Sequence, residues 1–281
     1  MADSGILASL RDGILVADGA MGTMLEAAGM LPGVCPEPWN VENPDAVANV
    51  HRGYADAGAG VVLTNTFGGS RTKLERYGLG DRVTEINAAA VDVARGVGAP
   101  FVAASIGPTG KILEPYGDAT VDELTDAFTE QIAACRDAGI IWVETMTDIG
   151  EARAAVTAAR RSTDLPIALT FTYDSTRSGP RTMMGVTPEA VAAELGDVAI
   201  LDVNCGTLDV CVAALRGYRD AGARANAGLP RWEHGRTVFP EGPADYAESI
   251  RPLAEIAGVI GGCCGTTPAH IKAVAAVIRE G

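Results

Sequence analysis

The chain has 281 residues, of which 47% are hydrophobic and 21% charged, so its composition is that of a globular protein with enough apolar side chains for a large core. Its formal net charge is −14 and its lysines and arginines form no cluster, which argues against nucleic acid and anionic membranes as partners. No run of about 20 apolar residues predicts a membrane span, and charged residues occupy the N-terminus, where a signal peptide would be apolar. We therefore expect a cytoplasmic protein.

Short runs of strand-forming residues alternate with longer helical patterns along the whole chain. The predicted strands cover residues 14–18, 60–64, 101–105, 140–144, 166–171, 198–203, 223–226 and 258–261. The clearest helix is predicted at 122–138, because apolar residues recur there at three- and four-residue spacing from Leu124 to Cys135. No linker or low-complexity segment interrupts the alternation, so we expect one domain over residues 1–281.

Eight strands, each followed by a helical segment, indicate a parallel sheet, because a parallel connection needs a crossover that is usually a helix. Eight such units in about 250 residues are typical of the closed (β/α)8 TIM barrel rather than of an open doubly wound sheet. The sequence therefore predicts an α/β protein with this barrel fold.

Polar or sulfur-containing side chains end or follow every predicted strand. They are Asp18, Thr64, Asn65, Ser105, Glu144, Thr170, Cys205, Asn226, Cys263 and Cys264. The carboxyl ends of all the strands of a barrel converge on one face, where the active sites of this fold lie. We therefore expect the functional site at that face.

Two adjacent cysteines flanked by glycines, Cys263 and Cys264, follow the last predicted strand, and Cys205 follows the sixth. A flexible backbone lets both neighbouring thiolates bind one ion, and a closed barrel brings Cys205 to the same face. Three thiolates with a free fourth position are typical of a catalytic zinc site. The alternative is that these cysteines are small buried side chains in tight turns, which is the role that we expect for the other three cysteines.

A three-thiolate set constrains the reaction that a bound zinc ion supports. Three negative sulfurs overcompensate the charge of the ion, so the site is poorly suited to making hydroxide but well suited to holding a fourth thiolate from a substrate. Such a thiolate stays nucleophilic near neutral pH. The pattern therefore disfavours hydrolysis and favours transfer of a group to a thiol.

Seven motifs resemble those of the homocysteine S-methyltransferase family. They are DGAMGT at 18–23, TNTFGG at 64–69, GPTG at 107–110, ET at 144–145, NCG at 204–206, NAGLP at 226–230 and GGCCGTTP at 261–268. The resemblance runs from about residue 13 to residue 278 and is strongest to the homocysteine-binding module of the corrinoid-dependent branch. It implies a barrel in which Cys205, Cys263 and Cys264 bind zinc and the zinc binds the homocysteine sulfur.

The resemblance also assigns the amino acid end of homocysteine to polar groups at the strand ends. The residues at those positions are Asp18, Gly19, Ser105 and Glu144, and Asn204, next to Cys205, is placed in the same set. A substrate ammonium in a partly desolvated pocket needs a carboxylate partner, which agrees with the two acidic residues. The alternative for Glu144 is a structural ion pair inside the barrel mouth.

The methyl donor is the least constrained part of the prediction. The resemblance to the corrinoid-dependent branch at residues 107–115 leads us to expect a methylcorrinoid on a separate protein, docked on the loops at 20–43 and 106–119. The alternative is a small betaine or sulfonium donor, which would need an aromatic cage for cation–π contact. The candidates for that cage are Trp39, Phe67 and Tyr116.

Two other functions stay open at this point. The acceptor of the methyl group is another thiol or a selenol in one of them, with the same fold and metal. In the other, the chain is a non-catalytic zinc- or thiol-binding partner of a corrinoid protein. Acidic residues at strand ends, Asp18 and Glu144, favour an amino acid substrate over a mere zinc store.

Overall fold

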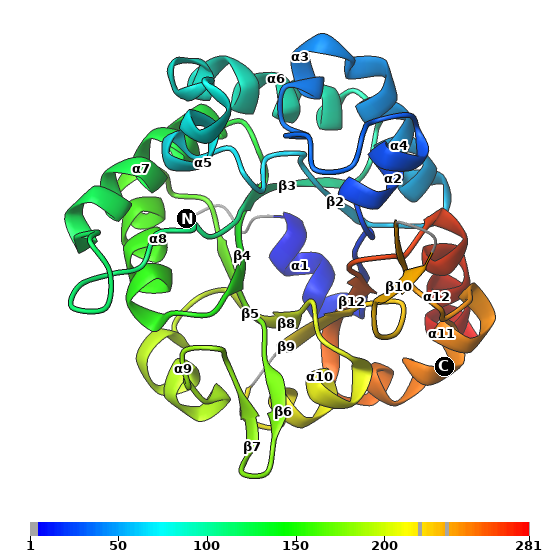
Figure 1. Cartoon of the computed structure of the whole chain (residues 1–281). Helices are drawn as coiled ribbons and strands as arrows, with labels where there is room; N and C mark the ends of the chain where they lie inside the picture. The colour runs from blue at the N-terminus through cyan, green and yellow to red at the C-terminus, as the bar shows by residue number, and fades with distance from the viewer. Residues whose placement is uncertain (1–4, 219–220, 234–235, 281) are drawn as a thin grey trace.

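The computed structural model describes residues 5–218, 221–233 and 236–280. Its main sheet consists of β1 (Leu15–Val16), β2 (Val61–Leu63), β3 (Phe101–Ile106), β4 (Ile140–Met146), β5 (Ile167–Phe171), β8 (Ile200–Asn204), β9 (Ala221–Ala225) and β12 (Ala257–Gly262). These strands are parallel, in the order β1-β12-β9-β8-β5-β4-β3-β2, and a parallel bridge between Ala17 and Val61 connects the two end strands. All eight predicted strands are present, and the (β/α)8 barrel is confirmed (Figure 1).

Helices surround the barrel on its outer side (Figure 1). The longer ones are α4 (Pro44–Asp56), α6 (Val83–Arg95), α7 (Val121–Ala134), α8 (Ile149–Ser162), α9 (Pro188–Leu195), α10 (Leu208–Leu215), α11 (Pro243–Ser249) and α12 (Pro268–Glu280). Short helices lie in the loops, namely α2 (Gly22–Ala27), α3 (Trp39–Glu42), α5 (Arg71–Leu74) and the 3-10 turns Glu75–Tyr77, Gly80–Arg82 and Arg251–Glu255. No helix in the described parts of the chain has both the length and the apolar character that a membrane span requires.

Helix α7 is present where the sequence predicted it, but it ends four residues earlier than expected. Its start is fixed by a capping box, in which Thr120 and Glu123 each accept a hydrogen bond from the other's backbone. After Ala134 the chain makes a tight turn, and Gly139 N then donates to Val102 O of β3. The apolar pattern in the sequence extends past the end of the helix because Cys135 and Ala138, which lie in this turn, are also buried.

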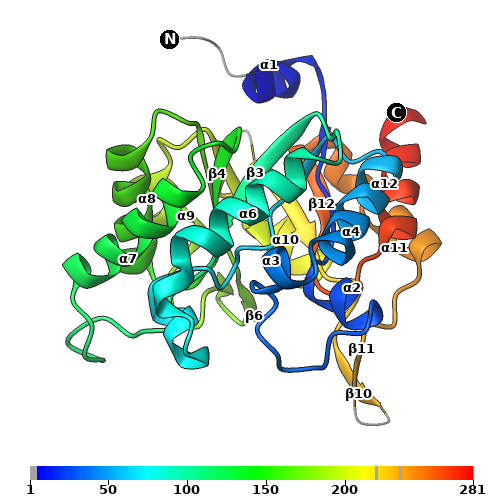
Figure 2. The ribbon, with the colours of Figure 1, turned by 90° about the horizontal axis from the view of Figure 1, so that it is seen from above.

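The two ends of the barrel differ. Helix α1 (Gly5–Asp12) lies across the end where the strands begin, and its Ile6 is fully buried in the apolar cluster that fills the barrel interior (Figure 2). The opposite end carries the hairpins β6 (Asp174–Thr176) with β7 (Gly179–Arg181) and β10 (Arg231–Glu233) with β11 (Arg236–Val238). Neither α1 nor the hairpins were predicted. Because α1 covers one end, a ligand reaches the barrel from the carboxyl ends of the strands.

Candidate active site

A cavity of about 560 Å³ opens at the carboxyl ends of the barrel strands. Its walls come from the loops after β1 and β2 and from the ends of β3, β4, β8, β9 and β12. The predicted residues that line it are Asp18, Gly19, Phe67, Ser105, Glu144, Cys205, Cys263 and Cys264. The structure therefore has a cavity at the expected location of the site, the face where the strands end.

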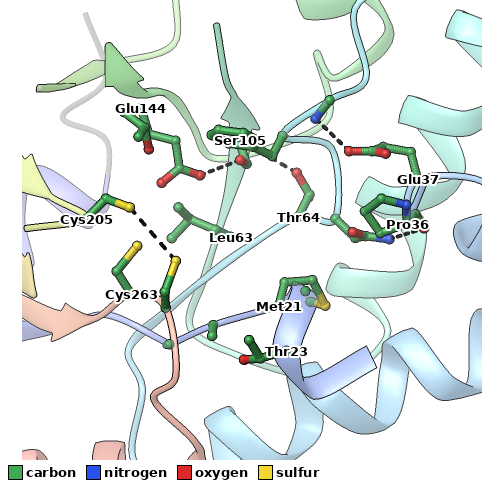
Figure 3. Close-up of a pocket in the computed structure, with 18 of the residues that line it drawn as sticks. Met21, Thr23, Pro36, Glu37, Leu63, Thr64, Ser105, Glu144, Cys205 and Cys263 are labelled. Atoms are coloured by element: carbon green, nitrogen blue, oxygen red, sulfur yellow. Dashed lines mark hydrogen bonds between the residues drawn. The ribbon is translucent and has the colours of Figure 1, made fainter. Parts of the chain in front are cut away.

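The three predicted thiols lie together. The Sγ atoms of Cys205, Cys263 and Cys264 are all within 4.8 Å of one another, and those of Cys205 and Cys264 are 3.9 Å apart (Figure 3). In a tetrahedral zinc site with Zn–S bonds of about 2.3 Å, neighbouring sulfurs are about 3.8 Å apart. All three cysteines are half-buried, so they face the cavity and not the core. The donor set therefore fits a zinc ion with one further position open to the cavity.

Local backbone geometry helps to aim these side chains. Cys205 directly follows β8 with φ of 58°, and Thr145, directly after Glu144, has φ of 61°. Left-handed backbone is uncommon for residues other than glycine and is concentrated at functional sites. Asn226 joins the two cysteine segments, since its Nδ2 donates to Cys205 O at 3.0 Å and its Oδ1 accepts from Cys264 N at 3.1 Å. The sequence had identified Asn226 as a polar residue at the end of the seventh predicted strand and as part of a motif.

Glu144 is the hub of a buried hydrogen-bond network. One carboxylate oxygen accepts from Ser105 Oγ (Figure 3), and the other accepts from Asn204 Nδ2 at 3.2 Å and from Arg224 Nη1 at 3.0 Å. Glu144 lines the cavity, as a partner for a substrate ammonium would have to. It also forms an ion pair within the barrel mouth, as the alternative interpretation requires.

Asn204 does not line the cavity itself, but its amide has an unused acceptor. Because a carboxylate accepts hydrogen bonds, the amide nitrogen of Asn204 must face Glu144, and this assigns the amide oxygen to the other side. That oxygen is buried and has no hydrogen-bond partner among the described residues. A buried acceptor without a partner is rare in folded proteins, and this one lies outside the cavity wall.

The structure shows two features of Asp18 and Gly19 that the sequence did not predict, the raised pKa of Asp18 and the lack of space for a side chain at Gly19. Burial raises the pKa of Asp18 to about 8, although Leu63 N donates to its carboxylate at 2.8 Å. Burial therefore favours the neutral form of this carboxyl group, which donates as well as accepts hydrogen bonds. At Gly19 a Cβ atom would lie 2.5 Å from Thr266 Oγ1, so glycine is needed there for the close approach of two loops.

The three aromatic residues predicted on the donor side do not come together. Phe67 lines the cavity, whereas Trp39 lines a separate hollow of about 450 Å³ and packs against the apolar cluster beneath α4. Tyr116 is 84% exposed and lines neither hollow. Tyr77, which was not predicted, lines both. A cage of Trp39, Phe67 and Tyr116 is therefore not present, because the start of α3 turns Trp39 towards the core.

Four charged residues that line the cavity were not predicted as site residues, namely Glu26, Glu37, Lys73 and Arg224. Arg224 on β9 is buried and pairs with Glu144, and an arginine between alanines within a buried strand was the signal that would have identified it. Glu37 lines the cavity on the side away from the thiols (Figure 3), where it accepts from Gly68 N at 2.6 Å and from Cys35 Sγ. No sequence signal distinguishes Glu37 from an ordinary acidic loop residue.

The fold and the site define a class of (β/α)8-barrel proteins with a metal-binding thiol cluster at the mouth of the barrel. The family model described as homocysteine S-methyltransferase matches residues 15–278. The chain belongs to this family.

Curated relatives match over the whole chain but are much longer. The methionine synthase of Mycobacterium tuberculosis is 33% identical over an alignment that covers 99% of this chain and 26% of the relative. The methionine synthase of Mycobacterium leprae is 32% identical, with 99% and 25% covered. The chain thus spans about a quarter of the length of these relatives.

Solved structures match over nearly their full length. The homocysteine methyltransferase MmuM from Escherichia coli, in its oxidised form, has a TM-score of 0.76 and 26% identity, and the match covers 96% of this chain and 98% of that one. Its metallated form gives a TM-score of 0.74 at the same identity, with 96% and 99% covered. The barrel alone therefore corresponds to an entire solved protein of this kind.

Proposed function

We propose that the chain is a zinc-dependent methyltransferase that moves a methyl group to the thiol of homocysteine, giving methionine. The observation that carries the proposal is the cluster of Cys205, Cys263 and Cys264 at the inner end of a cavity that Glu144 also lines. The family supports the reaction and the acceptor. The donor set and its spacing support zinc as the metal.

Cys205, Cys263 and Cys264 would hold the ion. Zinc, when bound, keeps a substrate thiol deprotonated and nucleophilic near neutral pH. In the transfer, a sulfur lone pair forms the new bond to the methyl carbon while the bond from that carbon to the donor breaks, and its electron pair leaves with the donor. The protein therefore acts by binding and orienting the nucleophile, which favours reaction through proximity.

The amino acid end of homocysteine fits the polar groups beside the thiols. The substrate ammonium has three donors, and Glu144, which lines the cavity, offers an acceptor for one of them. Asn204 takes part by donating to the Glu144 carboxylate. Ser105 orients the Glu144 carboxylate from the β3 side. Asp18 and Gly19 line the same cavity, where the neutral form of Asp18 is a hydrogen-bonding group for the substrate carboxylate.

For the donor, a methylcorrinoid on a separate protein is our first choice. The similarity to the methionine synthases supports it. The loops on the face of the cavity also expose large apolar side chains, as a docking surface does, namely Leu31, Val34, Ile112, Tyr116, Met183, Leu229 and Trp232. A corrinoid exceeds a cavity of about 560 Å³, so its carrier would have to dock against this face.

A small sulfonium or quaternary ammonium donor is the second candidate. Phe67 and Tyr77 line the cavity beside the carboxylates of Glu26 and Glu37, and aromatic faces with nearby carboxylates attract such cations. The match of this barrel covers 98% of the MmuM chain, so a homocysteine methyltransferase can consist of this barrel.

The deciding experiment incubates zinc-loaded protein and homocysteine with one donor at a time and measures methionine by mass spectrometry. The donors are free methylcobalamin, glycine betaine and dimethylsulfoniopropionate. We expect methionine with methylcobalamin and little with the other two. Saturable turnover of either small donor without a corrinoid would overturn the choice of donor. Binding of homocysteine without methionine from any donor would point to the non-catalytic partner function.

A further inference from the structure

We infer that Arg224 is a positioning residue for the substrate, which holds the Glu144 carboxylate so that its free lone pair and one net negative charge meet the ammonium of homocysteine. The inference rests on the proposed function, because it concerns the same cavity. It assigns a role to a residue that touches Glu144 and acts through it.

Arg224 is fixed on every side. Its Nε donates to Asp202 Oδ2 at 2.9 Å, its Nη1 lies 3.0 Å from Glu144 Oε2, and its Nη2 donates to Thr170 Oγ1 at 3.4 Å. The guanidinium carbon lies 4.9 Å from the centroid of the Trp142 ring, and the residue is 3% exposed. A planar guanidinium with several donors engaged in this way has one orientation. Glu144 is thereby held in one orientation as well.

The charges of this group match a single ammonium. Arg224 pairs with both Asp202 and Glu144, so with both carboxyl groups ionised the three residues together carry one net negative charge. Without the guanidinium, two buried carboxyl groups would lose their cationic partner, and burial, which already raises the pKa of Asp202, disfavours the ionised form of an unpaired acid. With it, the remaining charge is balanced when one cation binds at Glu144.

The hydrogen-bond count leads to the same ligand. An ionised carboxylate has about four acceptor sites, and Glu144 uses three of them for Ser105, Asn204 and Arg224. The free site of Glu144 is an acceptor, and Glu144 lines the cavity. An ammonium donates hydrogen bonds and accepts none, so it fits this site, whereas a carboxylate or a hydroxyl lone pair does not.

The test compares L-homocysteine with 4-mercaptobutanoate, which has the same thiol and carboxylate but no ammonium. Zinc content and the Kd of both thiols are measured for the wild type, Arg224→Gln and Arg224→Lys. For Arg224→Gln we expect the Kd of homocysteine to rise about tenfold or more, with little change for 4-mercaptobutanoate and for zinc. Arg224→Lys should recover part of the loss, because it restores the charge but not the fork of donors.

The outcomes separate the two proposals. Equal weakening of both thiols, or no change for either, would overturn the role of Arg224, since a merely structural residue does not distinguish the ligands. If Arg224→Gln fails to fold, the same comparison with Arg224→Lys decides, because a preference for homocysteine as strong as in the wild type would contradict the inference. Failure of the wild-type protein itself to bind homocysteine would instead overturn the proposed function. Arg153→Gln, which removes an exposed pair with Glu194, is the matched control and should change neither Kd.

Discussion

At the scale of single residues, the thiol cluster is preformed by hydrogen bonds that do not involve the sulfurs. Cys263 N donates to Ala225 O at 2.8 Å, and Thr266 Oγ1 donates to Cys263 O at 2.7 Å. Asn226 holds the segments of Cys205 and Cys264 together from the side. Because the backbone is already ordered, little conformational entropy is lost when a metal binds, and the metal gains affinity from this.

The metal proposal predicts that Cys263→Ala lowers zinc from one ion per chain to well below that ratio and abolishes methionine formation. Two thiolates leave an incomplete donor set for a borderline-soft ion that prefers four ligands. Metal content by mass spectrometry and turnover are measured on the same sample. Cys135→Ala, which removes a fully buried thiol in the core, is the control and should keep its zinc. Full zinc content and normal turnover in Cys263→Ala would contradict the assignment.

The substrate proposal predicts that Glu144→Gln weakens homocysteine binding more than zinc binding. The change keeps the size of the side chain but removes a charge-assisted contact to the ammonium, worth about 1.5–3 kcal/mol, so the Kd of homocysteine should rise about tenfold or more. Isothermal titration of the zinc-loaded protein measures it. Glu194→Gln, in an exposed ion pair on α9, is the control. An unchanged Kd would mean that Glu144 has only the structural role of pairing with Arg224.

Sequence reasoning found the cysteines because their spacing and their positions after predicted strands are both unusual. It placed Glu144 correctly at a strand end, but not its partner, since the ion pair with Arg224 joins β4 to β9 and depends on closure of the barrel. The raised pKa of Asp18 was equally out of reach, because it follows from burial, which no local pattern records. The sequence therefore did not predict the contacts between residues on different strands of the barrel.

At the scale of elements, the loops after β1 and β2 form one wall of the cavity. Asn65 Nδ2 donates to Pro36 O at 2.8 Å and to Asn40 Oδ1 at 3.1 Å, and Gly68 N donates to Glu37 at 2.6 Å. These bonds tie two loops that differ widely in sequence position. Phe67 lies between Asn65 and Gly68 and lines the cavity, so the hydrogen bonds on either side of it hold its backbone at the cavity wall.

This arrangement predicts which aromatic side chain affects a small donor. If a sulfonium or betaine compound is used, Phe67→Ala should raise its KM several-fold, because a cation–π contact of about 0.5–2 kcal/mol is lost. Trp39→Ala should leave that KM unchanged and lower stability instead, since Trp39 packs against the cluster beneath α4. Steady-state kinetics and urea unfolding are compared for the two variants. The reverse pattern would show that Trp39 reaches the donor.

The elements themselves were largely predictable, with two instructive exceptions. β9 was predicted at 223–226 and lies at Ala221–Ala225, and it has no β-branched residue, so its place in the sheet follows from pairing with β8 and β12 and not from propensity. The two hairpins at the mouth were missed because each strand has only three residues and little apolar periodicity. Strands this short have too few residues for a periodic pattern, so the sequence does not predict them.

At the scale of the whole molecule, the barrel separates stability from function along its axis. The end where the strands begin is sealed by α1, and the interior next to it is apolar, with Trp142 fully buried. Polar groups follow towards the mouth of the barrel, where Asp202 contacts Thr170 and Arg224. Arg224 and the three cysteines line the cavity. The fold class was predictable because this layering repeats in every strand, whereas α1 as a cover depends on packing at the closed end.

The outer layer contains a group that makes the stability of the whole fold depend on pH. His51 on α4 is fully buried, and neither ring nitrogen has a hydrogen-bond partner among the described residues. Burial lowers the pKa of His51 to about 4. The unfolded chain binds a proton at this histidine below its ordinary pKa of about 6.5, and the folded chain does so only near pH 4. The free energy of unfolding therefore contains the full contribution of the neutral ring above about pH 6.5. This contribution is lost progressively as the pH falls towards 4.

We predict that His51→Phe reduces this acid sensitivity. Between pH 7 and pH 4.5 the free energy of unfolding of the wild type should fall by about 2–3 kcal/mol more than that of the variant, since each unit of pKa shift corresponds to about 1.4 kcal/mol. Urea unfolding at a series of pH values measures both proteins. Other buried acids, including Asp18 and Asp202, titrate in both and cancel in the difference. Parallel pH dependences for the two proteins would mean that His51 is protonated, or gains a partner, within the folded state.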